Sequence, residues 1–169
     1  GLDDLLSLNF GPNRLYRNDA GRFAEVGGEA GVGDAGFGAS ATFLDYDGDG
    51  RIIRHYAEDA VIEGDLDLDA LFWDGVAGIW AERDLIVSGS IFNWEIDTSA
   101  CFLSIGRDLI CRNMVASSAD IRIGRDVSIN GLLSSTYNHG LLEVGRNAHA
   151  RYIIVDDHTT IVRGKAEAR

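Results

Sequence analysis

The chain has 169 residues and a formal net charge of −12, with 27 acidic side chains against 15 basic ones. Such an acidic composition disfavours nucleic acid as a partner, because phosphates are bound by clustered basic side chains, and it makes cations the more natural ligands. The length suffices for one sizeable core or two small ones. No apolar run approaches the roughly 18 residues that span a bilayer, so we expect no membrane-spanning segment.

The first 53 residues contain four short phrases in a fixed order. They are N-R-L-Y-R-N at 13–18, G-R-F at 21–23, E-A-G-V at 29–32 and D-Y-D-G-D-G at 45–50. Their order and spacing resemble the FG-GAP/VCBS repeat, the blade unit of calcium-binding β-propellers. The resemblance covers residues 3–50 and implies a small blade-like β segment. Because one blade is marginal alone, we expect residues 1–53 to cap the domain that follows. The alternative is that they belong with neighbouring blades beyond this chain.

The last of these phrases places three carboxylates, those of Asp45, Asp47 and Asp49, at alternate positions of a glycine-rich loop. Hard oxygen ligands at this spacing suit Ca²⁺, and Arg51 would add its backbone carbonyl. The FG-GAP/VCBS pattern has a further acid two residues on, where this chain has Ile53, so the resemblance implies a weakened calcium site. The alternative is a surface turn of Asp and Gly that binds no ion.

Three similar phrases recur in the second half, at 103–108, 121–126 and 142–147, and weaker copies lie at 62–65, 81–84 and 161–164. Each strong copy has two apolar residues flanking a polar one, followed by Gly106, Gly124 or Gly145, as expected of a half-buried strand that ends in a turn. Repeats this short must stack to bury a core. We therefore predict an all-β protein whose residues 54–169 form a right-handed parallel β-helix with coils of about 18–21 residues.

The alternation from Val61 through Phe72 indicates the first coil of the solenoid. We expect the following aromatic residues to pack at a corner or coil end rather than to form a ligand platform. Cys101 and Cys111 have no metal-binding spacing, and we interpret both as small core residues. The aromatic residues concerned are Phe72, Trp73, Trp80, Phe92 and Trp94.

Residues 55–164 resemble bacterial β-helix proteins labelled polymer-forming or bactofilin-like. The resemblance rests on the phrases E-G-D-L at 63–66, Y-N-H-G at 137–140 and D-D-H at 156–158, together with the repeated G-R-D phrases. It implies a right-handed stack of short coils that associate end to end, with a homo-oligomer or another protein as partner. It implies no reaction.

Two histidines and an aspartate recur at intervals of 19 residues, Asp120, His139 and His158. If these residues fall in one column on successive coils, they lie about 4.8 Å apart. With Asp157 beside them, such a column could hold Zn²⁺ or another transition ion. The alternative is a ladder of polar side chains, including Asn138, that hydrogen-bond to one another at the turns.

A non-enzymatic structural or interaction protein is the function that these patterns favour, binding calcium and self-assembling through its β-helix. The alternative is a carbohydrate-binding or carbohydrate-cleaving β-helix of the cell exterior, with candidate acids at Asp97, Asp156 and Asp157. Acids are abundant throughout the chain, so such a group is expected by chance, and no nucleophile or nucleotide motif is present. We expect a location outside the cell or in its envelope rather than in the cytoplasm.

Overall fold

The computed structural model describes residues 5–7, 14–19, 22–25, 51–95, 100–137 and 139–168. The chain divides into two compact units, Gly1–Thr42 and Phe43–Arg169. The described part of the first unit is an antiparallel sheet of three strands in the order β1-β2-β3. They are β1 (Leu5–Ser7), β2 (Arg14–Asp19) and β3 (Arg22–Glu25).

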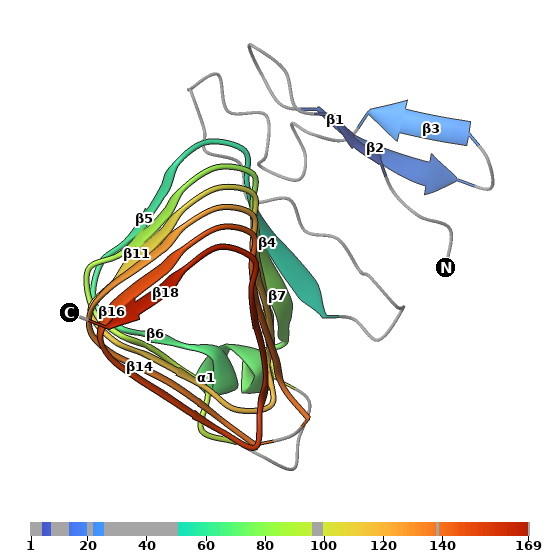
Figure 1. Ribbon diagram of the computed structural model, residues 1–169. Helices are drawn as coiled ribbons and strands as arrows, with labels where there is room; N and C mark the ends of the chain where they lie inside the picture. The colour runs from blue at the N-terminus through green and yellow to red at the C-terminus, as the bar shows by residue number, and fades with distance from the viewer. Residues whose placement is uncertain are drawn as a thin grey trace. The chain divides into compact units, whose positions relative to one another are not determined.

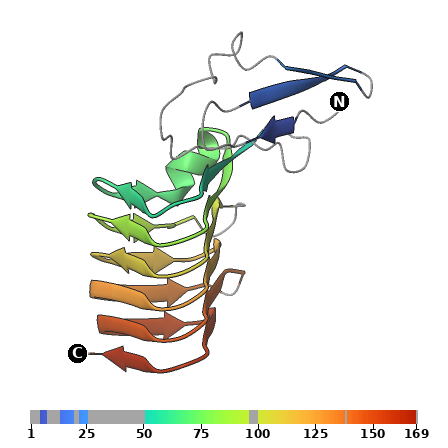
Figure 2. The ribbon, with the colours of Figure 1, turned by 90° about the horizontal axis from the view of Figure 1, so that it is seen from above.

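The second unit is a parallel β-solenoid of about five turns with a triangular cross-section (Figure 1). The coils stack in sequence order (Figure 2), and the two views together show a right-handed winding. Equivalent residues at one corner are separated by 25, 24, 18, 21 and 18 residues. The predicted fold is thus confirmed, with two longer coils at the N-terminal end.

Each side of the triangle is a ladder of parallel strands. The first side consists of β4 (Ile52–Tyr56), β7 (Val76–Ala81), β10 (Phe102–Ile105), β13 (Asp120–Ile123), β15 (Leu141–Val144) and β17 (Thr159–Val162). The second side begins with β5 (Ala60–Ile62), β8 (Leu85–Val87) and β11 (Leu109–Cys111), and the third with β6 (Leu66–Asp67), β9 (Ile91–Phe92) and β12 (Met114–Ala116). Two longer strands, β14 (Val127–Thr136) and β16 (Ala148–Asp156), then run along both sides, and β18 (Ala166–Ala168) ends the second.

The core consists of columns of apolar side chains that point inward on successive coils. Leu103, Ile121 and Leu142 are paired in register on the first side, and none is exposed. The two cysteines are free thiols in this core, as the sequence analysis predicts, and burial raises the pKa of each to about 12. Neither thiol is therefore ionised at neutral pH.

The repeated glycines are required by close approach of the coils rather than by a positive φ angle. Among the described glycines, positive φ angles occur at Gly64 and Gly75, not at the three glycines of the repeat. A Cβ atom at Gly124 would lie 2.3 Å from the carbonyl oxygen of Gly106, and one at Gly145 would lie 2.2 Å from that of Gly124. The turn expected at these positions is present, since β10, β13 and β15 each end directly before a repeat glycine and that glycine lies in a bend. Glycine is needed there because it lets the next coil pass over a backbone carbonyl.

The first coil contains a helix. Residues 61–72 belong to this coil, as the alternation indicates, but α1 (Leu68–Trp73) begins directly after β6. Asp67 starts the helix because its Oδ1 accepts hydrogen bonds from the backbone N–H groups of Asp69 (3.0 Å) and Ala70 (2.9 Å). Gly75, with φ of +82°, follows its end. The alternating pattern did not predict this helix, because the hydrogen bonds of the Asp67 N-cap compete with strand pairing.

An aspartate ladder runs along the corner between the first and second sides. The side-chain oxygen of each member accepts a hydrogen bond from the backbone N–H of the equivalent residue in the next coil, at 2.9 to 3.3 Å. These bonds bind adjacent coils where the strands are interrupted. The acceptors are Asp59, Asp84, Asp108, Asp126 and Asn147.

Candidate functional site

The predicted calcium ligands Asp45, Asp47 and Asp49 lie outside the described residues. Arg51 lies inside them, and its guanidinium carbon is 3.7 Å from the centroid of the Phe72 ring. This cation–π contact places the Arg51 side chain against α1. The calcium loop itself remains a prediction from the sequence.

The proposed transition-metal column does not have the expected register. Asp120 pairs with Leu141, and Leu141 with Thr159, so Asp120 is not aligned with His139 or His158. The equal intervals of 19 residues were misleading because the adjacent coils have different lengths. At the ladder corner, one coil has 21 residues and the next has 18. The carboxylate of Asp120 instead binds the guanidinium of Arg122 at 3.0 and 3.1 Å.

The two histidines of that column have different surroundings. His139 is exposed and its ring lies 5.0 Å from that of Tyr137, whereas His158 is partly buried and its Nδ1 lies 3.0 Å from the Thr160 hydroxyl. Asp157 is exposed in a turn with φ of +47°. Within the described residues, no group of three His, Cys, Asp or Glu side chains could hold a metal ion. The aligned column of side chains on which the zinc hypothesis was based is therefore not present in these residues.

The aromatic residues do not form one packed cluster. Phe72 is buried in the core, but Trp73, Trp80 and Trp94 are 67%, 46% and 66% exposed. The expectation of packing in the core is therefore correct for Phe72, whereas the tryptophans make ring contacts at the surface, Trp73 with Phe72 at 5.7 Å and Trp94 with Phe92 at 6.4 Å between centroids. Trp80 stacks on the ring of His55 at 4.5 Å between centroids.

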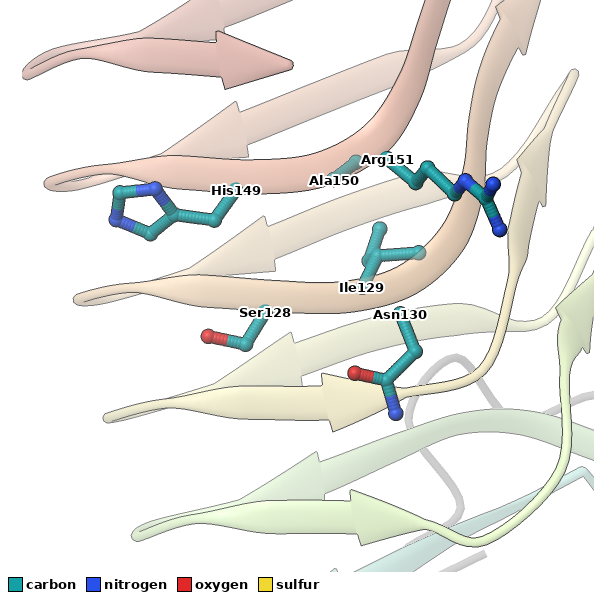
Figure 3. A pocket seen from close by; sticks show the side chains of 6 residues that line it. All are labelled: Ser128, Ile129, Asn130, His149, Ala150 and Arg151. Carbon is teal, nitrogen blue, oxygen red and sulfur yellow. The ribbon is translucent and has the colours of Figure 1, made fainter. Parts of the chain in front are cut away.

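An open hollow of about 340 Å³ lies on the outer surface of β14 and β16. Ser128 and Asn130 extend from β14, and His149 and Arg151 extend from the adjacent β16 (Figure 3). Ile129 and Ala150 complete its lining. The residues that line it include no carboxylate, so this hollow lacks the paired acids that cleavage of a glycosidic bond requires.

Three outward polar side chains stand in register through this region. Ser128 pairs with His149, and His149 with Glu167 of β18. His149 Nδ1 lies 3.4 Å from a carboxylate oxygen of Glu167, which fixes one edge of the imidazole. This contact holds the ring at the rim of the hollow.

The sequence analysis missed the hollow, although a signal for it was present. Ser128 and His149 are each the fourth residue after a repeat glycine, and Ile110 occupies that place in the preceding coil. Aligning the copies on their glycines therefore reveals an outward column that changes from apolar to polar. The candidate acids lie elsewhere: Asp156 ends β16 and Asp157 follows it in an exposed bend, while Asp97 lies outside the described residues.

The C-terminal coil exposes side chains that earlier coils bury. Val155 is 49% exposed, whereas Ser135, its partner one coil earlier, is fully buried. Ala166 and Ala168 are likewise exposed, although the residues that they pair with, Ala148 and Ala150, are buried. Among the described strands, β17 pairs with β15 alone and β18 with β16 alone. This end therefore presents both apolar surface and unpaired strand edges.

Comparison with known proteins bears on the first unit. Residues 1–52 match the family model described as FG-GAP-like repeat, which agrees with the resemblance found in their phrases. No curated protein and no solved structure is significantly similar to the chain. Within the described residues, no helix has the length and apolar character needed to cross a membrane. The chain thus combines an FG-GAP-like repeat with a β-solenoid.

Proposed function

We propose that this chain is a non-enzymatic structural protein in which a rigid solenoid carries the FG-GAP-like repeat and associates with a second copy through its C-terminal coil. The observation that carries the proposal is the exposed apolar surface of that coil. Val155, in an inward column, is 49% exposed, and Tyr152, Ile154 and Ile161, in outward columns, are 57%, 50% and 41% exposed. An uncovered coil with free strand edges is a template for another coil, because strand pairing satisfies its backbone groups.

Charge favours contact between two C-terminal ends. Residues 151–168 contain three acidic and three basic residues, and so their formal charges cancel. Residues 51–75, in contrast, contain seven acidic residues against two arginines. Two C-terminal coils can therefore approach without the repulsion that opposes two N-terminal coils. The expected product is a closed dimer with two-fold symmetry rather than an open filament.

Sedimentation velocity over a range of concentrations tests the association. We expect the wild-type chain to shift from monomer to dimer as concentration rises, and Val155→Arg to remain monomeric because it places a charge in the contact. Val61→Arg is the matched control, since Val61 is an exposed valine (61%) of the first coil. A wild-type chain that stays monomeric throughout would overturn the proposal. Filaments, or equal effects of both variants, would overturn the end-to-end geometry.

We further propose that the FG-GAP-like repeat binds Ca²⁺ through Asp45, Asp47 and Asp49. The family match over residues 1–52 supports this, together with the alternate spacing of the three acids. Ligand at 100 times its dissociation constant stabilises a folded state by about 2.7 kcal/mol. Ca²⁺ should therefore raise the melting temperature of the wild-type chain and of the control Asp156→Asn, but not that of Asp47→Asn. No calcium-dependent shift in the wild type would exclude the site.

A further inference from the structure

The third side of the solenoid has an outer surface without charged side chains. This side is a straight ladder of parallel strands (Figure 1). From the second coil to the fifth, its segments contain no Asp, Glu, Lys or Arg, although 25% of the chain is charged. The other two sides carry outward charges, such as Arg122 on the first and Glu167 on the second. We call the outer surface of these segments, residues 90–94, 113–118, 131–136 and 152–155, the neutral face.

Apolar and aromatic side chains lie in register on the neutral face. Their outward direction follows from the adjacent inward column, in which Ile91 and Met114 are fully buried. Leu132 pairs with Tyr152 in a second outward column. The face is therefore flat, with apolar side chains in every coil. The central outward column consists of Phe92, Val115, Ser134 and Ile154.

Exposed aromatic rings occupy both ends of the neutral face. At one end, the rings of Phe92 and Trp94 lie 6.4 Å apart with an angle of 31° between their planes, and Trp94 is 66% exposed. The carboxylate of Asp69 fixes this end, because it accepts a hydrogen bond from the backbone N–H of Trp94 at 2.6 Å. At the other end, Tyr152 is 57% exposed. The strands β9 and β16 are three coils apart, which corresponds to about 14 Å at about 4.8 Å per coil.

Polar groups on the same face are free to bind a ligand. Within the described residues, the hydroxyls of Ser134 and Tyr152 and the indole N–H of Trp94 make no hydrogen bond. A purely apolar partner would bury these groups without hydrogen bonds, which is unfavourable. Sugar hydroxyls both donate and accept, so they can satisfy all three groups. The apolar faces of sugar rings also pack well on aromatic side chains.

The size of the neutral face limits what can occupy it. Four strands about 4.8 Å apart, with about six residues each across the side, cover about 400 Å². A stable protein–protein interface buries about 800 Å² of each partner. A second copy of this chain or another folded protein therefore gains too little area here. A single extended chain of sugar rings, in contrast, matches the distance between the two aromatic ends.

From these observations we propose that the neutral face binds an uncharged polysaccharide, a β-1,4-linked glucan, whose chain crosses the strands. All hydroxyls of such a glucan project from the edges of its rings, so both ring faces are apolar and the chain is flat. Phe92 and Trp94 pack on a sugar ring at one end and Tyr152 packs on another, while Ser134 hydrogen-bonds between them. The face is a binding site without a reaction, and it depends neither on association of two copies nor on calcium.

Isothermal titration calorimetry of the full chain with cellohexaose tests this assignment. We expect saturable binding with a dissociation constant that does not change with salt concentration, because the face carries no charge. Trp94→Ala should raise the dissociation constant about fivefold, since one aromatic contact is lost. Trp73→Ala is the matched control, because Trp73 is equally exposed (67%) but lies on α1. Glucose should bind far more weakly, since one ring cannot reach both aromatic ends.

A second pair of variants tests the hydrogen bond. Ser134→Ala should raise the dissociation constant about threefold, as expected for one neutral hydrogen bond. Ser128→Ala, an outward serine of the second side, should bind as the wild type does. If Ser134→Ala leaves the affinity unchanged or increases it, the face recognises apolar surface rather than sugar and the proposal is wrong.

The remaining outcomes separate this site from the association of C-terminal coils. Val155→Arg should bind cellohexaose like the wild type even if it abolishes the dimer, because Val155 lies in an inward column. If Trp94→Ala instead abolishes the dimer in sedimentation velocity, the face is a protein contact and the assignment to a glucan fails. Absence of saturable heat with cellohexaose, or equal affinity of Trp94→Ala and Trp73→Ala, would also overturn the proposal.

Discussion

The two ends of the solenoid differ in what completes their last layer of side chains. In the first coil, α1 adds Leu68 and Phe72 to the core and packs on β7 and β9 (Figure 2). In the C-terminal coil no described element takes this place, and Val155 remains 49% exposed. The same repeat therefore gives a covered coil at one end and an open coil at the other. A terminal coil needs an element from outside the repeat to complete its burial.

The largest expected difference between the ends concerns truncation of one core side chain. Leu68→Ala should lower the free energy of unfolding by about 3 kcal/mol, because it leaves a cavity beneath α1, where Leu68 is fully buried. Ile153→Ala should cost only about 1 kcal/mol, since Ile153 is partly buried and the open end can relax around it. Urea denaturation measures both values. Equal losses would show that the two ends are packed alike.

Glycine substitutions compare the interior of the stack with its end. Gly124→Ala should cost about 1–3 kcal/mol, because its Cβ would overlap a backbone carbonyl that is fixed between two coils. This exceeds the gain of about 0.4–1 kcal/mol that the stiffer unfolded chain would give. Gly164→Ala meets a similar oxygen of Arg146 at 2.6 Å, but the last coil can shift, so its loss should be smaller. Denaturant midpoints that fall equally would contradict this difference.

The fold was predictable from sequence, whereas the polar surface of the last coils was not. Strand periodicity and the repeated glycines suffice for a parallel solenoid, because each inward column demands an apolar residue at a fixed place. The column of Asp120 and His139 was wrong because equal spacing implies equal coils, and these coils differ in length. The hollow near His149 depends on which residues become neighbours across strands. Only the register, not the sequence distance, gives that information.

Low pH should weaken the aspartate ladder at Asp126, which lies in the middle of the stack. Hydrogen bonds from the backbone N–H of Asn147 lower the pKa of Asp126 most, and the Asn147 amide and nearby arginines act in the same direction. The folded pKa is thus below the unfolded value, so this contribution is present above about pH 4 and is lost as pH falls through the folded pKa.

Asp126→Ala should therefore lower the thermal midpoint at pH 7 and reduce the loss of stability between pH 5 and about pH 2. Asn147→Ala should lower the midpoint less, because its side-chain oxygen accepts from Lys165 in the open terminal coil. Thermal melts over this pH range measure both effects. If Asp126→Ala and the wild type lose stability in parallel, the ladder makes no contribution through this carboxylate.

The smallest expected effect lies at His158, beside the open end. Partial burial lowers its pKa, and the nearby backbone of Ser117 and Thr159 opposes this only in part. The pKa of histidine in the unfolded chain is about 6.5. Below this pH the unfolded chain binds a proton that the folded chain does not, so the free energy of unfolding decreases as pH falls from about 6.5 to the folded pKa. His158→Gln should remove that part of the decline between pH 7.5 and pH 5.5, whereas the exposed control His139→Gln should retain it. Urea midpoints at the two pH values measure the difference. If His158→Gln loses as much stability as the wild type over this pH range, water reaches the charged imidazole in the folded chain. The exposed region of this end would then extend from Val155 to the adjoining turn.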